Sequence, residues 1–252
     1  MTIADKLTQL NTIKQDIKTA INNKGGSVAN NFTTYAAAIT NLPSGVPNGA
    51  IIYGKADVVT IEPYDATVKT IGDYDFRSWM HATGLVVGEG FEVIEQYAFQ
   101  GWTYAISLKL PSTLKTIGQY AFADWSSVTG HLEISDSVTS IGTSAFQGNK
   151  FTSARIGSGV TSLPTGGLGA STQMLNLDIS SSVASIAANF LINAISMQVI
   201  IVRAVNPPSV NASGTFFGGL PAGALIKVPA ASVGAYKAAS GWSVHASKIT
   251  SI

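Results

Sequence analysis

The sequence contains no cysteine and carries little charge. With no cysteine among 252 residues, a disulfide framework, a cysteine metal site and a thiol nucleophile are all excluded. Charged residues form 12% of the chain, and 15 Lys and Arg nearly balance 14 Asp and Glu, leaving a net charge of +1. This balance predicts no electrostatic attraction to nucleic acid or to an anionic membrane. A surface of Ser, Thr, Asn and Gly instead suits neutral polar partners.

A long apolar run is missing from the start of the chain. The sequence begins Met-Thr-Ile-Ala-Asp, with acidic and polar residues where a secretory signal or a membrane span needs an uninterrupted apolar stretch. We therefore expect a protein that is made and folded in a cytosol and does not insert into a membrane. If it acts outside a cell, we expect it to leave by lysis or by injection.

Motifs that carry chemistry are equally scarce. The three histidines, His81, His131 and His245, have no metal-ligand spacing and no adjacent pair of carboxylates. No Gly-x-Ser-x-Gly motif occurs, and the glycines at 166–169 lack the lysine of a phosphate-binding loop. We predict no catalytic residue, no metal site and no cofactor, and hence a protein that is not an enzyme.

Against this background, residues 71–202 carry one motif written six times. The copies are anchored at Ile71, Ile94, Ile117, Ile141, Leu163 and Ile186, with steps of 23, 23, 24, 22 and 23 residues. A fixed period in this range is typical of stacked supersecondary units, each of which buries its apolar face only against a neighbour. The period therefore predicts a solenoid.

Other positions keep the same register. An apolar residue stands three positions before each anchor and another five positions after it, as at Phe91 and Phe99 around Ile94. About fourteen residues after each anchor comes an alternating apolar pair, such as Leu132 and Ile134. Alternation with period two predicts a short strand with one buried face. Gly, Pro and Ser follow each pair and predict a turn into the next coil.

The pattern resembles the BspA-type leucine-rich repeat, roughly V-x-x-I-G-x-x-A-F, a spacer, then L-x-x-I-x-I-P. Copies at Ile94, Ile117 and Ile141 follow it closely, whereas Leu163 is followed by Pro164 in place of glycine. The resemblance covers a little over half of the chain. It implies a repeat solenoid made mainly of short β-strands and turns.

The rest of the chain completes four predicted parts. Residues 51–67 hold two short β-prone runs that are expected to cap the first coil, and IKVPAASVGAYKAASGW resembles the usual closing cap of BspA-type repeats. The predicted parts are an N-terminal helical attachment or oligomerisation module at 1–45, a linker and cap at 46–67, a six-coil solenoid at 68–204 and a C-terminal cap at 205–252.

Residues 2–24 are predicted to form a helix with a narrow apolar stripe. The stripe consists of Ile3, Leu7, Leu10, Ile17 and Ile21. Such a stripe suits a short coiled coil or docking onto a partner. The alternative is a helix that folds back on the end of the solenoid.

The opening IKTAINNKGGSVANNFTTYAAAITNLPSG resembles a segment recurrent in bacteriophage structural proteins, of the form I-K-x-A-I-x-x-K-G followed by F-x-x-Y-A-x-x-I. The resemblance implies an attachment module that joins a distal domain to a virion. It also implies assembly in the host cytoplasm, other virion proteins as partners of this module, and a homo-oligomer, with a trimer favoured.

Two sets of residues are candidate binding surfaces. The first comprises two aromatic ladders in the first three coils, Trp79, Trp102 and Trp125 with Tyr74, Tyr97 and Tyr120. They either form a platform for sugar rings or partner side chains, or the tryptophans fill the interior. The second is the outward face of the strands, with Lys109, His131, Glu133, Arg155, Asn176 and Asp178. That face is either a recognition surface or merely solvated.

These patterns together predict a non-enzymatic phage virion component of the tail, baseplate or fibre. Its solenoid would recognise or adhere to a host cell-surface glycan or protein. The alternatives are a purely structural head or tail decoration protein, and a bacterial BspA-type surface adhesin.

Overall fold

The structure is a computed structural model that describes residues 50–53, 58–63, 66–79, 82–210 and 215–252. Of residues 50–53, only the backbone is described. The predicted helical module at 1–45, with its apolar stripe from Ile3 to Ile21, lies outside these residues. The described residues comprise the solenoid and its two caps.

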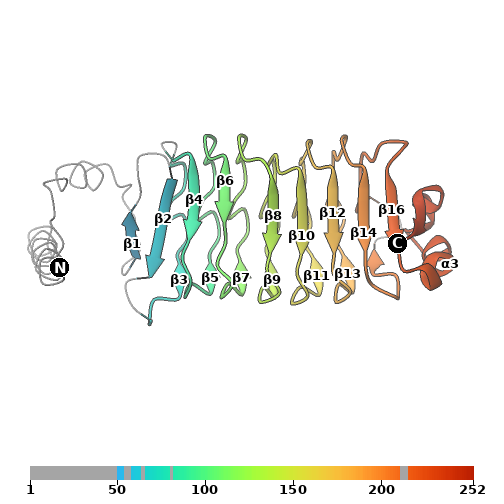
Figure 1. Cartoon of the computed structure of the whole chain (residues 1–252), viewed down its shortest axis with the longest axis horizontal. Coiled ribbons are helices and arrows are strands. Elements are labelled where there is room, and N and C mark those ends of the chain that lie inside the picture. The colour runs from blue at the N-terminus through green and yellow to red at the C-terminus, as the bar shows by residue number, and fades with distance from the viewer. Residues whose placement is uncertain (1–49, 54–57, 64–65, 80–81, 211–214) are drawn as a thin grey trace, which may run out of the picture. The chain divides into compact units, whose positions relative to one another are not determined.

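One side of the solenoid is a row of longer strands that run parallel to one another (Figure 1). The first, β1, is antiparallel to β2 and closes the start of the row. The strands are β1 (Ala50–Tyr53), β2 (Val58–Pro63), β4 (Gly84–Val87), β6 (Ser107–Lys109), β8 (His131–Ile134), β10 (Ser153–Ile156), β12 (Asn176–Ile179), β14 (Val199–Val202), β16 (Leu225–Val228) and β17 (Ile249–Ser251).

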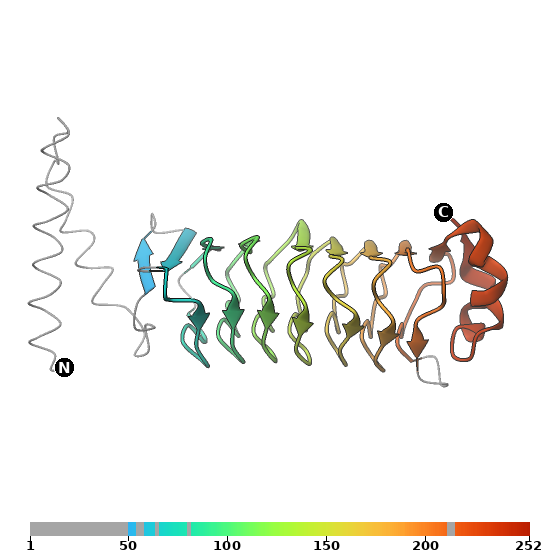
Figure 2. The same ribbon diagram turned by 90° about the horizontal axis from the view of Figure 1, so that it is seen from below.

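A second row of two-residue strands holds the anchor residues of the repeats (Figure 2). These strands are β3 (Thr70–Ile71), β5 (Val93–Ile94), β7 (Thr116–Ile117), β9 (Ser140–Ile141), β11 (Ser162–Leu163), β13 (Ser185–Ile186) and β15 (Ser209–Val210). Each coil thus contributes one strand to each row. The predicted repeat solenoid of short strands and turns is confirmed, and β15 continues the second row beyond the six predicted coils.

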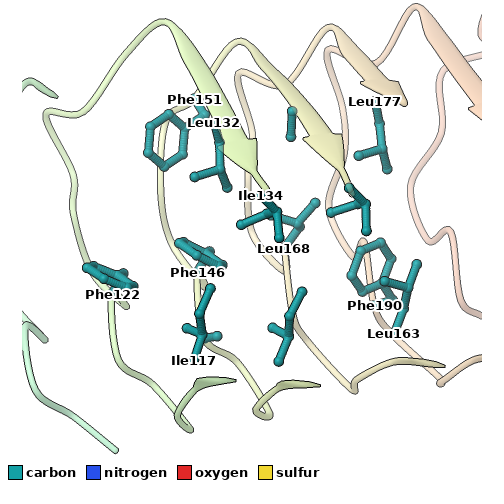
Figure 3. Close-up of a cluster of buried hydrophobic side chains, with 14 of the residues drawn as sticks. Ile117, Phe122, Leu132, Ile134, Phe146, Phe151, Leu163, Leu168, Leu177 and Phe190 are labelled. Carbon is teal, nitrogen blue, oxygen red and sulfur yellow. The ribbon is translucent and has the colours of Figure 1, made fainter. Parts of the chain in front are cut away.

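Apolar side chains from both rows meet in the interior (Figure 3). The phenylalanines five residues after the anchors form a continuous stack: Phe76, Phe99, Phe122 and Phe146 have successive ring centroids 5.3 Å apart. Their exposed fraction is at most 1%. Since identical side chains lie one above the other, each coil removes the apolar surface of the next from water, which is the main force that holds a solenoid together.

The row of longer strands is interrupted once, between β6 and β8. The stretch from Phe122 to Leu132 holds one residue more than the equivalent stretch from Phe99 to Leu108 in the coil before. Across the interruption, a backbone hydrogen bond of 3.4 Å remains, from the N–H of Thr129 to the carbonyl of Ile106. The extra residue shifts β8 away from β6, so the row consists of two sheets.

The row of short strands is interrupted between β9 and β11, where Pro164 follows the anchor. In other coils the residue at this position donates its N–H to the anchor carbonyl of the preceding coil: Gly118 to Ile94, Gly142 to Ile117 and Ala187 to Leu163, at 2.7, 2.7 and 2.9 Å. Proline has no N–H, so the equivalent bond to Ile141 cannot form. Among the described residues, the N–H groups of Thr161 and Ser162 also make no backbone hydrogen bond to the preceding coil, unlike those of Thr139 and Ser140, so the missing bond at Pro164 is part of a wider break in this row.

The C-terminal cap covers the last coil with helical segments (Figure 1). It consists of β16, the 3₁₀ helix η1 (Ala230–Ser232), the helix α3 (Val233–Ala238), the 3₁₀ helix η2 (Ser243–Lys248) and β17. Tyr236 and Trp242 are fully buried, and they donate hydrogen bonds of 2.8 Å to the carbonyls of Ala204 and Pro208. Burial raises the pKa of Tyr236 well above its ordinary value. A strand, helical segments and a final strand therefore follow one another in the C-terminal part of the chain.

Candidate binding surfaces

The outward side of β8, β10 and β12 forms a continuous polar surface, called the strand face. These strands pair in parallel and in register, so equivalent residues lie side by side. One line across the face consists of His131, Ser153 and Asn176, and the next of Glu133, Arg155 and Asp178. Five of the six residues predicted from the sequence are therefore brought together. The sixth, Lys109, lies on β6 and is separated from them by the interruption.

Charged groups on the strand face largely neutralise one another. Arg155 pairs with Glu133 at 2.5 Å and with Asp136 at 2.8 Å. The backbone N–H of Ser158 and then the Arg155 guanidinium lower the pKa of Asp136, while hydrogen bonds from Arg155 to Glu133 and Asp136 raise the pKa of Arg155. These exposed pairs add little stability. Their effect is to hold the side chains in one arrangement.

A second ion pair extends the strand face toward the C-terminal cap. Arg203 donates two hydrogen bonds of 2.7 Å to the carboxylate of Asp178, a bidentate geometry that fixes both groups. Beyond it the face is more apolar, with Val199 and Ile201 half-buried and Leu225 38% exposed. One charged residue, Lys227, lies in register with Ile201. Sequence reasoning missed Arg203 because it follows β14 and has no counterpart in the other coils.

Of the two interpretations of the tryptophans, burial in the interior holds for Trp102 and Trp125, and the exposed platform does not. Trp102 and Trp125 are fully buried, and Trp79 packs half-buried against the core. The indole N–H groups of Trp102 and Trp125 donate hydrogen bonds of 2.6 and 2.7 Å to the carbonyls of Phe76 and Phe99 in the preceding coils. A satisfied N–H makes complete burial of the indole favourable. Trp102 and Trp125 thus fill the interior, and Trp79 covers its edge in the first coil.

The three tyrosines, called the tyrosine ladder, lie at the surface. Tyr74 is 47% exposed, and Tyr97 and Tyr120 are half-buried. Successive ring centroids are 4.9 and 5.2 Å apart, with interplanar angles of 7° and 12°. Because the rings stack face to face along the solenoid axis, they cover one another's faces. What the ladder presents to solvent is a row of ring edges and hydroxyl groups, which corrects the expectation of a flat platform for sugar rings.

Each ladder tyrosine has a left-handed backbone conformation. The φ angles of Tyr74, Tyr97 and Tyr120 are 61°, 57° and 51°. Residues other than glycine adopt this region at a cost of about 1–2 kcal/mol, and bulky residues rarely do. At the equivalent position later coils have Ser144, Gly166 and Asn189, all with a positive φ, and glycine and asparagine tolerate such angles best. Three bulky residues at a strained position indicate a role that glycine or asparagine does not fulfil.

Polar side chains flank the ladder on both sides. The guanidinium of Arg77 lies 5.5 and 5.7 Å from the ring centroids of Tyr74 and Tyr97, and these nearly equal distances place it beside the stack. Preceding the tyrosines in sequence are Asp73 and Gln96, which are joined by a hydrogen bond of 3.2 Å. Sequence reasoning missed these residues, although a polar residue before each ladder tyrosine was the available signal.

Groups that could support catalysis or metal binding are sparse. Among the residues that the structure describes, no three His, Asp or Glu side chains gather closely enough to hold a metal ion. His131 contacts Ser153 and Glu133 on the strand face, whereas the His245 ring packs edge-on against Phe216. His81 lies outside the described residues. Within the same residues, no helix has the length and apolar composition that a membrane span needs.

Comparison with protein families gives one match. A model of the BspA type leucine-rich repeat region matches residues 69–198 in six copies, which is 130 of the 252 residues. No curated protein sequence matches the chain. The predicted resemblance to BspA-type repeats is thereby confirmed, whereas the predicted phage module at 1–45 stays a prediction.

Solved structures of bacterial proteins resemble the chain in fold. They are the pneumococcal vaccine antigen PcpA (18% identity, TM-score 0.50, covering 76% of this chain and 39% of that one), the T. pallidum leucine-rich repeat protein TpLRR (16%, 0.52, 73% and 85%) and a leucine-rich repeat protein from Bacteroides ovatus (16%, 0.54, 73% and 55%). The chain thus spans about two-fifths of the pneumococcal protein. Identities this low show a common fold alone.

Proposed function

The chain belongs to the BspA-type leucine-rich repeat family, and from this premise we propose that it is a non-enzymatic protein that recognises a host cell surface. The observation that carries this proposal is the strand face. Its exposed polar side chains lie in register on β8, β10 and β12 and are held by Arg155 and Arg203. Continuous strand faces of this kind are common binding surfaces in repeat proteins.

The physical basis is preorganisation. Side chains fixed by ion pairs on a paired sheet lose little conformational entropy when a ligand binds, so more of the contact free energy appears as affinity. Many copies on one particle would then convert weak individual contacts into avidity. No reaction step is part of this proposal, and neither is a cofactor, a nucleic acid or membrane insertion.

For the biological setting, we propose a phage virion in whose tail, baseplate or fibre the chain is held by residues 1–45. The support is the resemblance of the opening sequence to a segment of bacteriophage structural proteins. Other virion proteins would contact this module, and the chain would form a homo-oligomer, with a trimer favoured. Light scattering of the full chain and of residues 46–252 tests this, because equal oligomeric states would exclude the module as the contact.

Two other functions remain as alternatives. The repeats by themselves favour a bacterial BspA-type surface adhesin, while the near-neutral surface, rich in Ser and Thr, also suits a decoration protein that packs only against virion neighbours. Immunogold labelling of intact phage particles and host cells separates the settings. Label on virions excludes the bacterial adhesin, and label on uninfected cells excludes both virion roles.

Binding of the labelled full chain to a panel of bacteria and to their wall polysaccharides tests the recognition role. The informative variant is Asn176→Lys, at the exposed start of β12 in the strand face. Thr161→Lys is the matched control, because Thr161 is also exposed but lies next to β11 in the other row. We expect saturable binding to particular strains, weakened more than tenfold by Asn176→Lys and unchanged by Thr161→Lys.

A folded wild-type protein that binds no strain would overturn the recognition role and favour decoration. Equal binding by the two variants would instead place recognition away from the strand face.

A further inference from the structure

We propose that the tyrosine ladder and the polar groups beside it bind an extended, neutral β-1,4-linked polysaccharide, with one sugar residue for each coil. This inference rests on the proposed surface-recognition function and names a ligand class and a second site for it. The site is the edge of the first three coils that carries Tyr74, Tyr97 and Tyr120, with Asp73, Gln96 and Arg77 at its sides. It is distinct from the strand face.

The first argument is the spacing of the three tyrosine rings, which form the rungs of the ladder. Ring centroids repeat at 4.9 and 5.2 Å, because each tyrosine belongs to one coil and the coils are stacked at the spacing of paired strands. Sugar residues in an extended β-1,4-linked chain repeat at nearly the same interval. A chain laid along the solenoid axis therefore presents each rung with an equivalent set of sugar hydroxyls. An α-1,4-linked chain curves into a helix and loses this match after one or two rungs.

The hydroxyl groups of the ladder are the second argument. None of the three hydroxyls has a hydrogen-bond partner among the described residues. Stacking alone would be served equally well by phenylalanine, which occurs at the parallel stack inside the solenoid. A phenol hydroxyl donates one hydrogen bond and accepts others, which is the complement of a sugar hydroxyl. Since the ring faces are covered, the sugar contacts the edges and hydroxyls.

The groups beside the ladder are the third argument. Asp73 and Gln96 directly precede the first two ladder tyrosines and supply planar hydrogen-bond acceptors and donors. Arg77 supplies donors beside the rings of these two tyrosines. Planar groups with several hydrogen-bonding atoms suit vicinal sugar hydroxyls. The guanidinium of Arg77 is accompanied by the carboxylates of Asp73 and of Asp75, which interact electrostatically with each other, so the site disfavours an anionic polymer. A neutral glycan, which binds through hydrogen bonds alone, fits these groups.

Backbone strain supports a functional origin of the ladder. The left-handed conformation recurs at Tyr74, Tyr97 and Tyr120, and then at Ser144, Gly166 and Asn189 in the later coils. The later coils thus keep the conformation but not the tyrosine. The site therefore ends at the third coil, which predicts that affinity rises with oligosaccharide length up to three or four sugars and levels off beyond that.

The test is isothermal titration calorimetry of the full chain with three hexasaccharides. Cellohexaose and chitohexaose share the β-1,4 linkage but differ in the substituent at C2, and maltohexaose has the same length with α-1,4 linkages. The variant is the triple substitution Tyr74→Phe, Tyr97→Phe and Tyr120→Phe, which keeps ring stacking and backbone strain and removes only the hydroxyls. The control is Tyr104→Phe, because Tyr104 is 61% exposed and stands outside the ladder.

We expect at least one β-1,4 hexasaccharide to bind in a saturable way, and maltohexaose to bind at least tenfold more weakly. The triple variant should weaken binding by about tenfold or more, since each lost hydrogen bond removes a factor of about 2 to 10. Tyr104→Phe should leave binding unchanged.

Three results would overturn the inference: binding of neither β-1,4 hexasaccharide, equal binding of maltohexaose, or a triple variant that binds as tightly as the wild type. Saturable binding of the chain to host cells alongside any of these results would leave the proposed function standing and remove only the glycan site. If the chain bound neither host cells nor a β-1,4 hexasaccharide, both the proposed function and the glycan site would be overturned. The relative affinity for cellohexaose and chitohexaose then identifies the sugar.

Discussion

At the scale of single residues, equivalent positions in successive coils form columns inside the solenoid. The neighbours within a column determine which side chains can be buried there. Trp102 and Trp125 occupy a column that continues as Asn149 and Ser171 in the next coils, and all four are buried. Asn149 accepts a hydrogen bond of 3.0 Å from the backbone N–H of Trp125. Among the described residues, however, neither its Nδ2 atom nor the Oγ of Ser171 has a hydrogen-bond partner. The buried polar side-chain atoms of this column therefore all form hydrogen bonds only in the coils where the residue is tryptophan.

Trp125 provides a stability prediction. Trp125→Ala should lower the free energy of unfolding by about 3–5 kcal/mol, because it opens a cavity in the stack. Trp125→Phe should cost less, about 1–3 kcal/mol, since the ring remains but the carbonyl of Phe99 loses its donor. Urea unfolding measures both. Tyr104→Ala, at an exposed position, is the control and should change stability by less than about 0.5 kcal/mol. A Trp125→Ala variant as stable as this control would contradict the burial.

Asp75 provides a pH prediction. It stands in a column that other coils fill with buried alanines such as Ala98, and desolvation raises its pKa above the usual 3.8 despite a hydrogen bond from the N–H of Gly72. The folded protein thus holds this proton more tightly than the unfolded chain. The contribution of Asp75 to stability is complete below pH 3.8 and is lost as the pH rises through the raised pKa. Asp75→Asn should therefore raise the Tm at neutral pH.

The advantage of Asp75→Asn should shrink toward zero below pH 3.8, which thermal melts across pH will show. Asp136→Asn is the opposite control. Hydrogen bonds from the Ser158 backbone and from Arg155 lower the pKa of Asp136, so its contribution is present at neutral pH and is lost on acidification. This variant should never melt above the wild type at neutral pH. A Tm advantage of Asp75→Asn that does not depend on pH would rule out a titration effect.

At the scale of the elements, the strands could be predicted well from the sequence, whereas the pairing between strands of successive coils could not. Alternation at Leu132 and Ile134 predicts β8 because burial of one face imposes period two. The interruption before β8 arises from one extra residue, whose effect depends on how the turn packs. The sequence left burial of Trp102 as one of two alternatives, because the hydrogen-bond acceptor that decides it lies 26 residues earlier, which is more than one repeat.

The candidate site shows the same limit. Register placed Tyr74, Tyr97 and Tyr120 one above the other, and the structure agrees. Whether the rings meet face to face or lie flat on the surface is set by side-chain torsion, which has no signature in the repeat. The ion pair of Arg203 with Asp178 was hidden for a related reason, since it joins a repeat position to a residue outside the pattern.

Pro164 provides a prediction for the second row of strands. Pro164→Ala restores an N–H that can donate to the carbonyl of Ile141, and Ala187 shows that alanine forms this bond one coil later. We expect the new amide and its neighbours in β11 to exchange hydrogen at least tenfold more slowly than an unstructured peptide. Amides at the uninterrupted junction of β5 and β7 serve as an internal reference and should not change. If the new amide exchanged at the unstructured rate, more than the missing N–H would separate the strands.

At the scale of the whole molecule, a solenoid has no single core whose loss is felt everywhere. Each coil contacts its neighbours, so stability is close to a sum of coil and junction terms. The C-terminal cap contributes through Trp242, whose ring packs against those of Phe216, Phe217 and Tyr236. Damage to the cap should therefore remain near that end of the chain.

This locality is testable with Trp242→Ala. Hydrogen exchange followed by mass spectrometry should show a loss of protection of about tenfold or more in β14 and β16, and little change in β4 and β5. The reciprocal variant Phe76→Ala, in the first coil, should reverse the pattern, because its ring stacks on Phe99 at the opposite end. Uniform loss of protection in both variants would mean that the solenoid unfolds as one cooperative unit.

The two interruptions also give the molecule a mechanical character. A load applied along the stack passes through the coil junctions in series, so extension concentrates where the fewest backbone hydrogen bonds cross. Where β6 and β8 are not paired, the short strands β5 and β7 of the same two coils remain paired. Where β9 and β11 are not paired, the longer strands β10 and β12 of the same two coils remain paired. Backbone hydrogen bonds of the turns also cross both junctions, for example from Phe99 to Ala121 and from Phe146 to Gly167, at 2.8 and 3.0 Å. Each interruption therefore weakens its junction without opening it, and under tension we expect the body to bend at these two junctions before any coil unravels.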